Sequence, residues 1–215
     1  MKINRTTFPV APEGFPFIAA AAILTIVLAA FSVKLLALLG VLLTVFIVYF
    51  FRNPHRAVPV EEGAVVAPAD GVIVFLGNAH ESHLDEEMLK ISIFMSVFNV
   101  HVNRVPFSGR VLDVFYKRGK FLDARDTNAT FENEQSGIIL ETEKGIKMVF
   151  VQVAGLIARR IVSYPAKGDS LAVGERYGLI RFGSRVDVYL PGTIDVRVAL
   201  GDKTIAGETI LGCLR

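Results

Sequence analysis

Hydrophobic and polar positions divide the chain into two parts. Across positions 15–51 the only charged residue is Lys34, which separates the apolar runs Phe15–Val33 and Leu35–Phe51. The length of each run is close to the roughly 20 residues that a helix needs to cross the hydrocarbon core of a bilayer. The pattern therefore predicts a membrane-associated helical segment over these positions.

Basic residues flank the apolar segment on both sides. Lys2 and Arg5 lie in a polar lead at 1–14, and Arg52 and Arg56 follow the second run. Because basic residues concentrate on the cytoplasmic side of membranes, we expect a helical hairpin in the cell membrane with both ends, and the domain that follows, on the cytoplasmic side. A single tilted span with the other run lying in the interface stays open, since the second run is short and the join has neither Gly nor Pro.

From residue 52 onward the pattern changes to short apolar and β-branched runs separated by turn residues. Their regular spacing, without a long amphipathic helix, predicts a mainly β domain over 52–215, a compact barrel or sandwich. The polar segment 123–134 is expected to be a loop or short helix that lines or covers a site. The expected strands are 63–66, 71–76, 89–97, 109–116, 137–141, 147–153, 161–164, 179–182, 185–190 and 193–200.

Composition narrows the classes of function. The chain has 215 residues, of which 52% are hydrophobic and 20% charged, and its formal net charge is +2. This small charge, without a basic block, argues against nucleic acid as a partner. Cys213 is the only cysteine, which excludes an intramolecular disulfide and a structural thiolate metal site. His80 and His83 have a spacing that metal ligands use, but no third ligand cluster is evident, so no metal is expected.

The candidate chemistry lies at the Gly183-Ser184 pair. Gly183 has no side chain to shield its carbonyl, and a strained turn would bring the hydroxyl of Ser184 onto that carbonyl. Most Gly-Ser pairs are solvated turns. Here Arg-Phe precedes the pair, and an alternating run with Val186, Val188 and Leu190 follows it. The pair is therefore a candidate for a self-cleaving peptide bond.

Further motifs precede this pair. The aromatic and basic stretch 50–56 (FFRNPHR) comes first and is followed by Pro68-Ala69-Asp70-Gly71, a turn between apolar runs. The apolar segment 94–106 contains His101 in the sequence His-Val-Asn-Arg-Val-Pro, and the segment 152–161 ends in Ala-Arg-Arg-Ile. Taken singly, each has a plain explanation: a turn aspartate, a core histidine or a pair of surface arginines.

In this order, the motifs resemble those of phosphatidylserine decarboxylase proenzymes of the short form. The resemblance covers about residues 50–191, most of the β domain. It implies self-cleavage between Gly183 and Ser184 into a β chain (1–183) and an α chain (184–215) that remain associated. It also implies that Ser184 becomes a pyruvoyl group, so that the protein makes its own cofactor.

The resemblance further implies the reaction. Phosphatidylserine in the membrane would form a Schiff base with the pyruvoyl group, lose carbon dioxide and leave as phosphatidylethanolamine, in phospholipid biosynthesis. His101 is expected to protonate the carbanion equivalent, because imidazole titrates near neutral pH, and Asp70 to orient or polarise groups during self-cleavage. Arg159 and Arg160 are expected to hold the lipid phosphate or the substrate carboxylate. Asn103 is a further substrate-binding candidate.

One position departs from the family's pattern. Longer members carry two histidines three residues apart, where this chain has His101 and Arg104. A guanidinium stays protonated and cannot act as a neutral base. Either His101 serves both cleavage and decarboxylation, or cleavage relies on strain and carbonyl polarisation, and the sequence leaves both open.

Two other classes of function stay open. A membrane-anchored serine hydrolase would use Ser184, His101 and Asp70, although the Gly-x-Ser-x-Gly elbow is missing from the sequence. A non-catalytic lipoyl-like β domain would carry its group on Lys147, near a β turn, where a lysine on a solvated strand face is the simpler interpretation. The sequence does not give the oligomeric state, and a homo-oligomer stays open.

Overall fold

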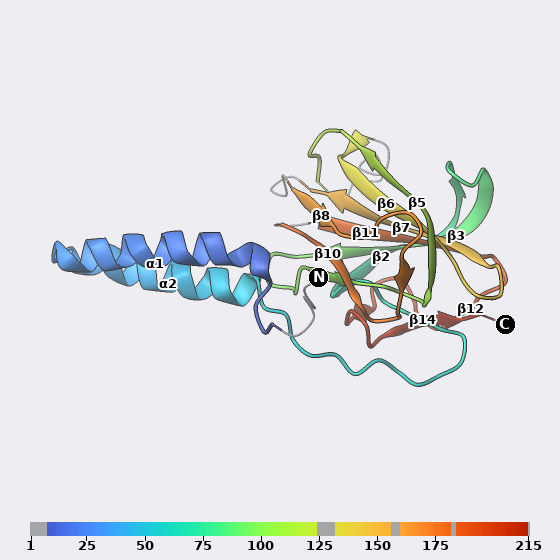
Figure 1. The fold of residues 1–215 in the computed structure, drawn as a ribbon, viewed down its shortest axis with the longest axis horizontal. Helices are drawn as coiled ribbons and strands as arrows, with labels where there is room; N and C mark the ends of the chain where they lie inside the picture. Colours follow the sequence, from blue (N-terminus) through green and yellow to red (C-terminus); the bar gives the residue numbers. More distant parts are fainter. Residues whose placement is uncertain (1–7, 124–131, 156–159, 182–183, 215) are drawn as a thin grey trace. The chain divides into compact units, whose positions relative to one another are not determined.

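The computed structural model divides into two compact units. The first unit ends at His55 and is helical, and the second begins at Arg56 and is built from strands (Figure 1). The structure describes residues 8–123, 132–155, 160–181 and 184–214.

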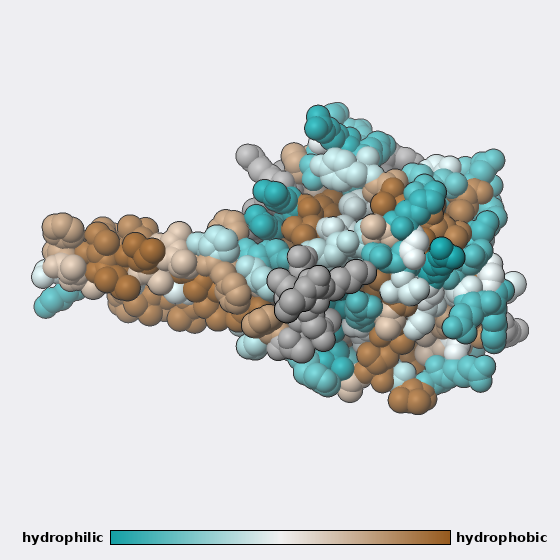
Figure 2. All heavy atoms as spheres, viewed as in Figure 1, coloured by the Kyte–Doolittle hydropathy of each residue, from teal (hydrophilic) through white to brown (hydrophobic). Residues whose placement is uncertain are grey.

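The first unit contains a pair of helices joined by a tight turn. A 3-10 turn, Pro12–Gly14, leads into α1 (Phe15–Ala30), and α2 spans Lys34–Phe50. The stretch Pro12–Ala30 is long and apolar enough to cross a membrane, whereas α2 is apolar but shorter. Figure 2 shows hydrophobic side chains along most of the length of the pair.

Small residues bring the two helices close together. A Cβ added at Gly40 of α2 would lie 2.5 Å from the Thr25 hydroxyl of α1. The hydroxyls of Thr25 and Thr44 are 3.5 Å apart, and each is also bonded to a carbonyl one turn earlier in its own helix. The two apolar runs of the sequence therefore form a helical hairpin, as predicted.

The second unit is built around a large antiparallel sheet. Its strand order is β13-β2-β3-β11-β7-β6-β5-β9, and the sheet is strongly curled (Figure 1). The mainly β fold predicted from the sequence is confirmed. The strands of this sheet are β2 (Gly71–Glu81), β3 (Glu86–Met95), β5 (Gly109–Lys117), β6 (Gln135–Glu141), β7 (Lys147–Ala154), β9 (Ser170–Leu171), β11 (Ser184–Leu190) and β13 (Lys203–Thr204).

Smaller sheets complete the described part of the β unit. One has the order β1-β14-β12 and the other the order β4-β10-β8. Their strands are β1 (Ala64–Val66), β4 (Val102–Arg104), β8 (Ile161–Ser163), β10 (Arg176–Ile180), β12 (Asp195–Val196) and β14 (Ile210–Cys213).

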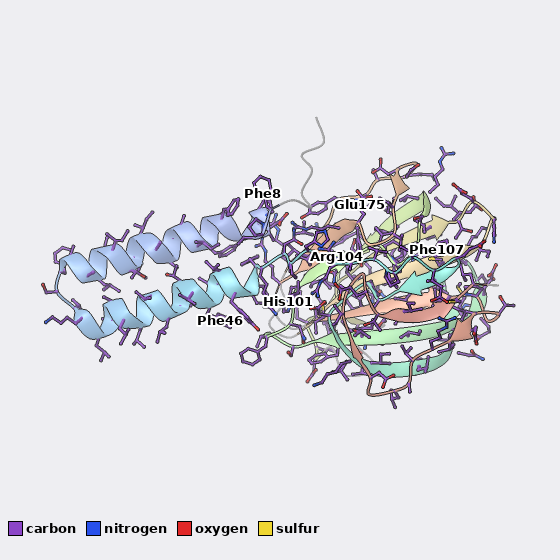
Figure 3. All side chains as sticks on the ribbon, turned by 90° about the horizontal axis from the view of Figure 1, so that it is seen from below. Phe8, Phe46, His101, Arg104, Phe107 and Glu175 are labelled. Carbon is purple, nitrogen blue, oxygen red and sulfur yellow. The ribbon has the colours of Figure 1, made fainter. Side chains whose placement is uncertain are left out.

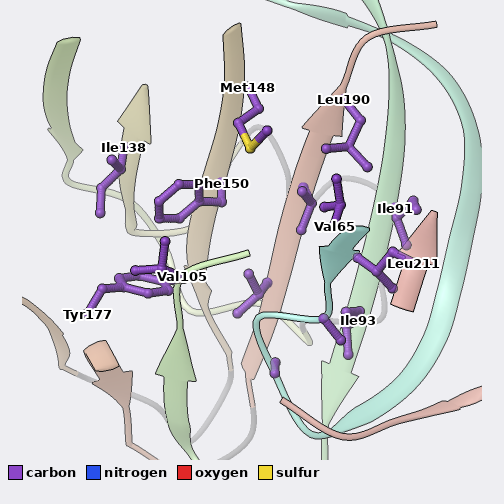
Figure 4. Packing of buried hydrophobic residues seen from close by; sticks show 14 of the residues in the cluster. Val65, Ile91, Ile93, Val105, Ile138, Met148, Phe150, Tyr177, Leu190 and Leu211 are labelled. Atoms are coloured by element: carbon purple, nitrogen blue, oxygen red, sulfur yellow. The ribbon is translucent and has the colours of Figure 1, made fainter. Parts of the chain in front are cut away.

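The main hydrophobic core lies between one face of the large sheet and these smaller sheets. Val188 of β11, Phe150 of β7 and Ile93 of β3 contribute to it from the large sheet. Tyr177 of β10 packs edge-on against Phe150, with ring centroids 5.0 Å apart (Figure 4). β11 is central in this arrangement, since every one of its residues is buried.

The strands differ from the expected ranges in several places: β9, β13 and β14 were not expected, and two further differences are instructive. β4 was not expected, because it is short and its pairing with β10 comes from a distant part of the chain. The expected strand over 193–200 is wrong in part, since β12 has only Asp195 and Val196. Turn contacts interrupt the ladder on both sides: Ile194 donates to the carbonyl of Pro191, and Asp202 donates to that of Ala199.

Candidate active site

Ser184 is the first residue of β11 and lies inside the protein. Its neighbours in the sheet are Met95 of β3 and Ala154 of β7. Its relative exposure is 0%, and its Oγ has no hydrogen-bond partner among the described residues. A buried hydroxyl without a partner is uncommon and costs stability, so it is a typical mark of a functional position.

His101 lies in the connection between β3 and β4, which begins beside Ser184. β3 ends at Met95, and the chain then turns where Asn99 Oδ1 accepts bonds of 2.8 Å from both the N–H and the hydroxyl of Ser96. His101 is buried, and its Nδ1 lies 3.0 Å from the carbonyl oxygen of Asn99. Because a carbonyl only accepts, Nδ1 is the donor, which leaves the proton chemistry of a neutral ring to Nε2.

A buried amide pair lies next to Met95. Gln152 Nε2 donates to Asn103 Oδ1 over 2.9 Å, and Asn103 Nδ2 makes a weak contact of 3.6 Å with Met95 Sδ. Gln152 Oε1 is buried and has no hydrogen-bond partner among the described residues. By strand alternation Gln152 points to the same face of the sheet as Ser184. The pair therefore offers an acceptor and a weakly used donor near the serine.

Asp70 belongs to an ionic cluster. Arg56 Nη2 lies 2.9 and 2.7 Å from its two carboxylate oxygens, and the Ala206 N–H donates to Oδ1 over 2.8 Å. Arg104 lies beside the turn at Gly174, whose carbonyl it binds over 2.9 Å (Figure 3). Burial, and then the charge of Arg56, lower the pKa of Arg104, whereas Asp70 raises it. Asp70 and Arg104 are thus electrostatic neighbours.

The predicted site residues fall into three groups. Ser184, Asn103 and the connection that carries His101 meet around Met95. Asp70 instead contacts Arg56 and the backbone of Ala206. Arg160 is exposed, and its carbonyl accepts a bond of 3.3 Å from the N–H of Arg181. Gly183 and Arg159 lie outside the described residues, as does most of the polar segment 123–134.

Sequence reasoning missed Gln152 as a site residue. The signal is present in the sequence, because Gln152 is the single polar side chain in the otherwise apolar run Met148–Ala154. A polar side chain in a run buried on both faces needs a hydrogen-bond partner, which predicts a buried network or a site. Its partner Asn103 lies on another sheet, so the pairing itself could not be read from the sequence.

The alternative functions gain no support from the contacts of their key residues. No base among the described residues bonds to Ser184 Oγ, as a serine hydrolase would require. Lys147 is exposed at the start of β7, opposite Glu141. His80 lies 3.3 Å from Asp85, whereas His83 lies 2.9 Å from Glu81. The two histidines therefore have different carboxylate partners.

Comparison with known proteins agrees with the motifs. Residues 43–212 match the family described as phosphatidylserine decarboxylase. A phosphatidylserine decarboxylase proenzyme from Geotalea uraniireducens is 66% identical over 211 residues, which cover 98% of this chain and 99% of that protein. Proteins of the same name from Geobacter metallireducens and Geobacter sulfurreducens are 65% and 61% identical, with coverage of 98% or more of either chain. The chain belongs to the phosphatidylserine decarboxylase family.

Proposed function

We propose that the protein cleaves itself between Gly183 and Ser184 and then decarboxylates phosphatidylserine to phosphatidylethanolamine. The observation that carries the proposal is the buried hydroxyl of Ser184, which lacks a partner among the described residues, at the first position of β11. Relatives that match the chain over nearly its whole length are named as proenzymes of this decarboxylase.

Self-cleavage follows from the chemistry of the serine hydroxyl. Ser184 Oγ attacks the carbonyl carbon of residue 183, and the peptide bond is exchanged for an ester. Loss of the α-proton of residue 184 then eliminates the upstream chain as a carboxylate. Addition of water to the dehydroalanine that remains, with release of ammonia, gives the pyruvoyl group. Arg104 is no base for these steps, because its guanidinium stays protonated and binds the Gly174 carbonyl.

The surroundings of Ser184 fit a small uncharged group. Its sheet neighbours Met95 and Ala154 are buried and apolar, and the amides of Asn103 and Gln152 lie close by. A pyruvoyl group there supplies an electrophilic carbonyl that draws electrons from the bound substrate as carbon dioxide leaves. Residues 1–183 and 184–215 would remain associated, because β11 is hydrogen-bonded to a strand on each side.

The residues of this chain would bind and protonate the substrate. Asn103 Nδ2 can donate to a carboxylate oxygen, and Gln152 Oε1 can accept from an ammonium group, which together match an amino-acid headgroup. His101, with both ring nitrogens protonated, would deliver the Nε2 proton to the α-carbon after decarboxylation. Arg159 and Arg160 remain candidates for binding the lipid phosphate. Asp70 remains a candidate for orienting or polarising the reacting groups during self-cleavage.

The helical hairpin gives the enzyme access to a substrate that stays in the bilayer. A stretch long and apolar enough to span a membrane lies at Pro12–Ala30. The basic residues at both ends of the hairpin favour a cytoplasmic β unit. We therefore place the reaction at the cytoplasmic surface of the cell membrane.

The full chain purified in detergent tests the proposal. Intact mass should show two fragments, 1–183 and 184–215, the second blocked by a pyruvoyl group, and the sample should release labelled carbon dioxide from phosphatidylserine carrying ¹⁴C in its carboxylate. Ser184→Ala should stay a single chain and release none. A wild-type chain that stays uncut and inactive would contradict the proposal.

The variant His101→Ala separates self-cleavage from decarboxylation. We expect it to lower decarboxylation by about 100-fold or more, because general acid catalysis contributes factors of that order. The measurement is ¹⁴CO₂ release per mole of cleaved protein, with the exposed His80→Ala as the matched control. Turnover at the wild-type rate in His101→Ala would assign the proton to another group.

A further inference from the structure

A pocket lies on the face of the large sheet that points away from Ser184. Its volume is about 460 Å³, within the range of small-molecule sites. Along β11, Arg185 and Asp187 line it, whereas Ser184 and Val186 point to the opposite face. The pocket therefore shares a strand with the candidate active site but is separated from it by the sheet.

Cross-strand neighbours form the floor of this pocket. The register of the sheet places Phe75, Ser92, Asp187 and Val151 side by side on β2, β3, β11 and β7. All four residues line the pocket. The floor thus has a polar centre between two apolar flanks.

The turn between β2 and β3 closes the pocket from the side. The ring of His83 in this turn stacks on Phe115 of β5, with centroids 3.6 Å apart. Glu81 holds the turn in place by accepting backbone N–H bonds of 3.0 and 2.8 Å from His83 and Leu84. Gly137 leaves space for the ring of Phe115, because a Cβ at position 137 would overlap that ring. The enclosure is therefore built by specific contacts.

The floor carries more positive than negative charge. Asp187 Oδ2 lies 3.0 Å from Lys90 Nζ, and Asp187 Oδ1 lies 2.7 Å from Arg185 Nε. The relative exposures of these three residues are 6% for Lys90, 3% for Arg185 and 1% for Asp187. The other described lining residues with a formal charge are Lys117 and Glu81, of opposite sign. By formal count the described lining therefore has three cations and two carboxylates.

Ser92 supplies an independent sign of a ligand. Its relative exposure is 1%, it lines the pocket, and its Oγ has no hydrogen-bond partner among the described residues. A buried hydroxyl of this kind is usually satisfied by a ligand or a water molecule. Because Ser92 stands beside Asp187 and two residues from Lys90, its O–H can donate to an anion that the lysine also attracts.

We propose that this pocket binds a small carboxylate with an apolar body, at a site distinct from the decarboxylation site. The single excess positive charge matches a monoanion better than a phosphate dianion. The carboxylate oxygens would accept from Ser92 Oγ and Lys90 Nζ, and the apolar body would contact Phe75, Phe115 and Val151. This site does not depend on the proposed decarboxylase activity.

Hexanoate tests the proposal, with the full chain in a neutral maltoside detergent and binding measured by calorimetry and by saturation-transfer NMR. We expect hexanoate to bind, and 1-hexanol and inorganic phosphate to bind at least tenfold more weakly. Ser92→Ala should weaken hexanoate binding about tenfold, the effect of one hydrogen bond to a charged group. Lys90→Met should abolish it, because Arg185 and Asp187 then cancel.

Matched variants outside the pocket complete the design. Ser170→Ala and Lys147→Met change exposed residues of the same types and should leave hexanoate affinity unchanged. Circular dichroism melting establishes that Ser92→Ala folds, so the proposal stays testable even if Lys90→Met does not. Equal hexanoate affinity in wild type and Ser92→Ala, or equal binding of hexanol and hexanoate, would overturn it.

Discussion

Gln152 has a carbonyl oxygen that the described protein does not use, next to the serine on which the proposed reaction depends. If this oxygen accepts from the amine of the headgroup, Gln152→Leu should lower kcat/KM about tenfold or more, mainly through KM, while self-cleavage still proceeds. Steady-state kinetics on the cleaved variant check this. Gln135→Leu, a change of the same type on the other face of the sheet, is the control.

A second buried polar atom without a partner among the described residues lies in the hydrophobic core, where we expect it to lower stability. The hydroxyl of Tyr177 is buried in the core and has no hydrogen-bond partner among the described residues. Tyr177→Phe keeps the ring that packs on Phe150 and removes the unpaired hydroxyl. We expect it to raise stability by about 1 kcal/mol, which is about 2–4 °C in Tm for a chain of this size. A lower Tm would mean that the hydroxyl has a bound water.

The same substitution has a signature in alkaline solution. Burial raises the pKa of Tyr177 well above its usual value of 10.0. Above pH 10 the unfolded tyrosine loses its proton while the folded one keeps it, so this group's contribution to stability is complete below pH 10 and is lost as the pH rises. Stability measured between pH 10 and 12 should therefore fall less steeply in Tyr177→Phe than in wild type.

At the scale of single elements, β11 shows what the sequence could predict. Val186, Val188 and Leu190 alternate, and the predicted strand 185–190 agrees with β11 within one residue. Alternation by itself is typical of a strand with one solvated face. Here the polar residues Arg185 and Asp187 are buried as well, because the sheet curls and the turn between β2 and β3 reaches β5.

Long-range pairing limited the prediction of the site. The motif around His101 could be recognised, but its position near Ser184 depends on the pairing of Met95 with Ser184, which no local spacing reveals. The partner of Asp70 was missed as well: Arg56 belongs to the motif that precedes Asp70, but their separation of 14 residues does not reveal that the two side chains meet. Local alternation thus predicted strands, whereas contacts between strands required the structure.

The ionic contact on β11 gives a prediction at the scale of this element. Asp187→Ala removes the carboxylate between Lys90 and Arg185, and leaving buried cations without it should cost about 3–5 kcal/mol. The melting temperature and the yield of folded protein measure the effect. Asp195→Ala, at an exposed aspartate of β12, should change stability by less than about 0.5 kcal/mol. Equal melting of the two variants would disprove a stabilising role for the contact.

For the whole molecule, the two compact units predict separable membrane binding and chemistry. The unit that ends at His55 carries the apolar helices, and the β unit from Arg56 contains Ser184, His101 and Gln152. The full chain should stay with membranes in alkaline carbonate, whereas a chain of residues 56–215 should be released. Retention of the shorter chain in the membrane pellet would place the anchor in the β unit.

The central position of β11 has a consequence for refolding after cleavage. Its first residue is the proposed start of the downstream chain, yet the strand is bonded on one side to β3 and on the other to β7. Once cleaved, the two chains could regain this arrangement only by finding each other in a second-order step. The mature protein would thus inherit its fold from the precursor. Its unfolding midpoint should rise with protein concentration, and that of uncut Ser184→Ala should not.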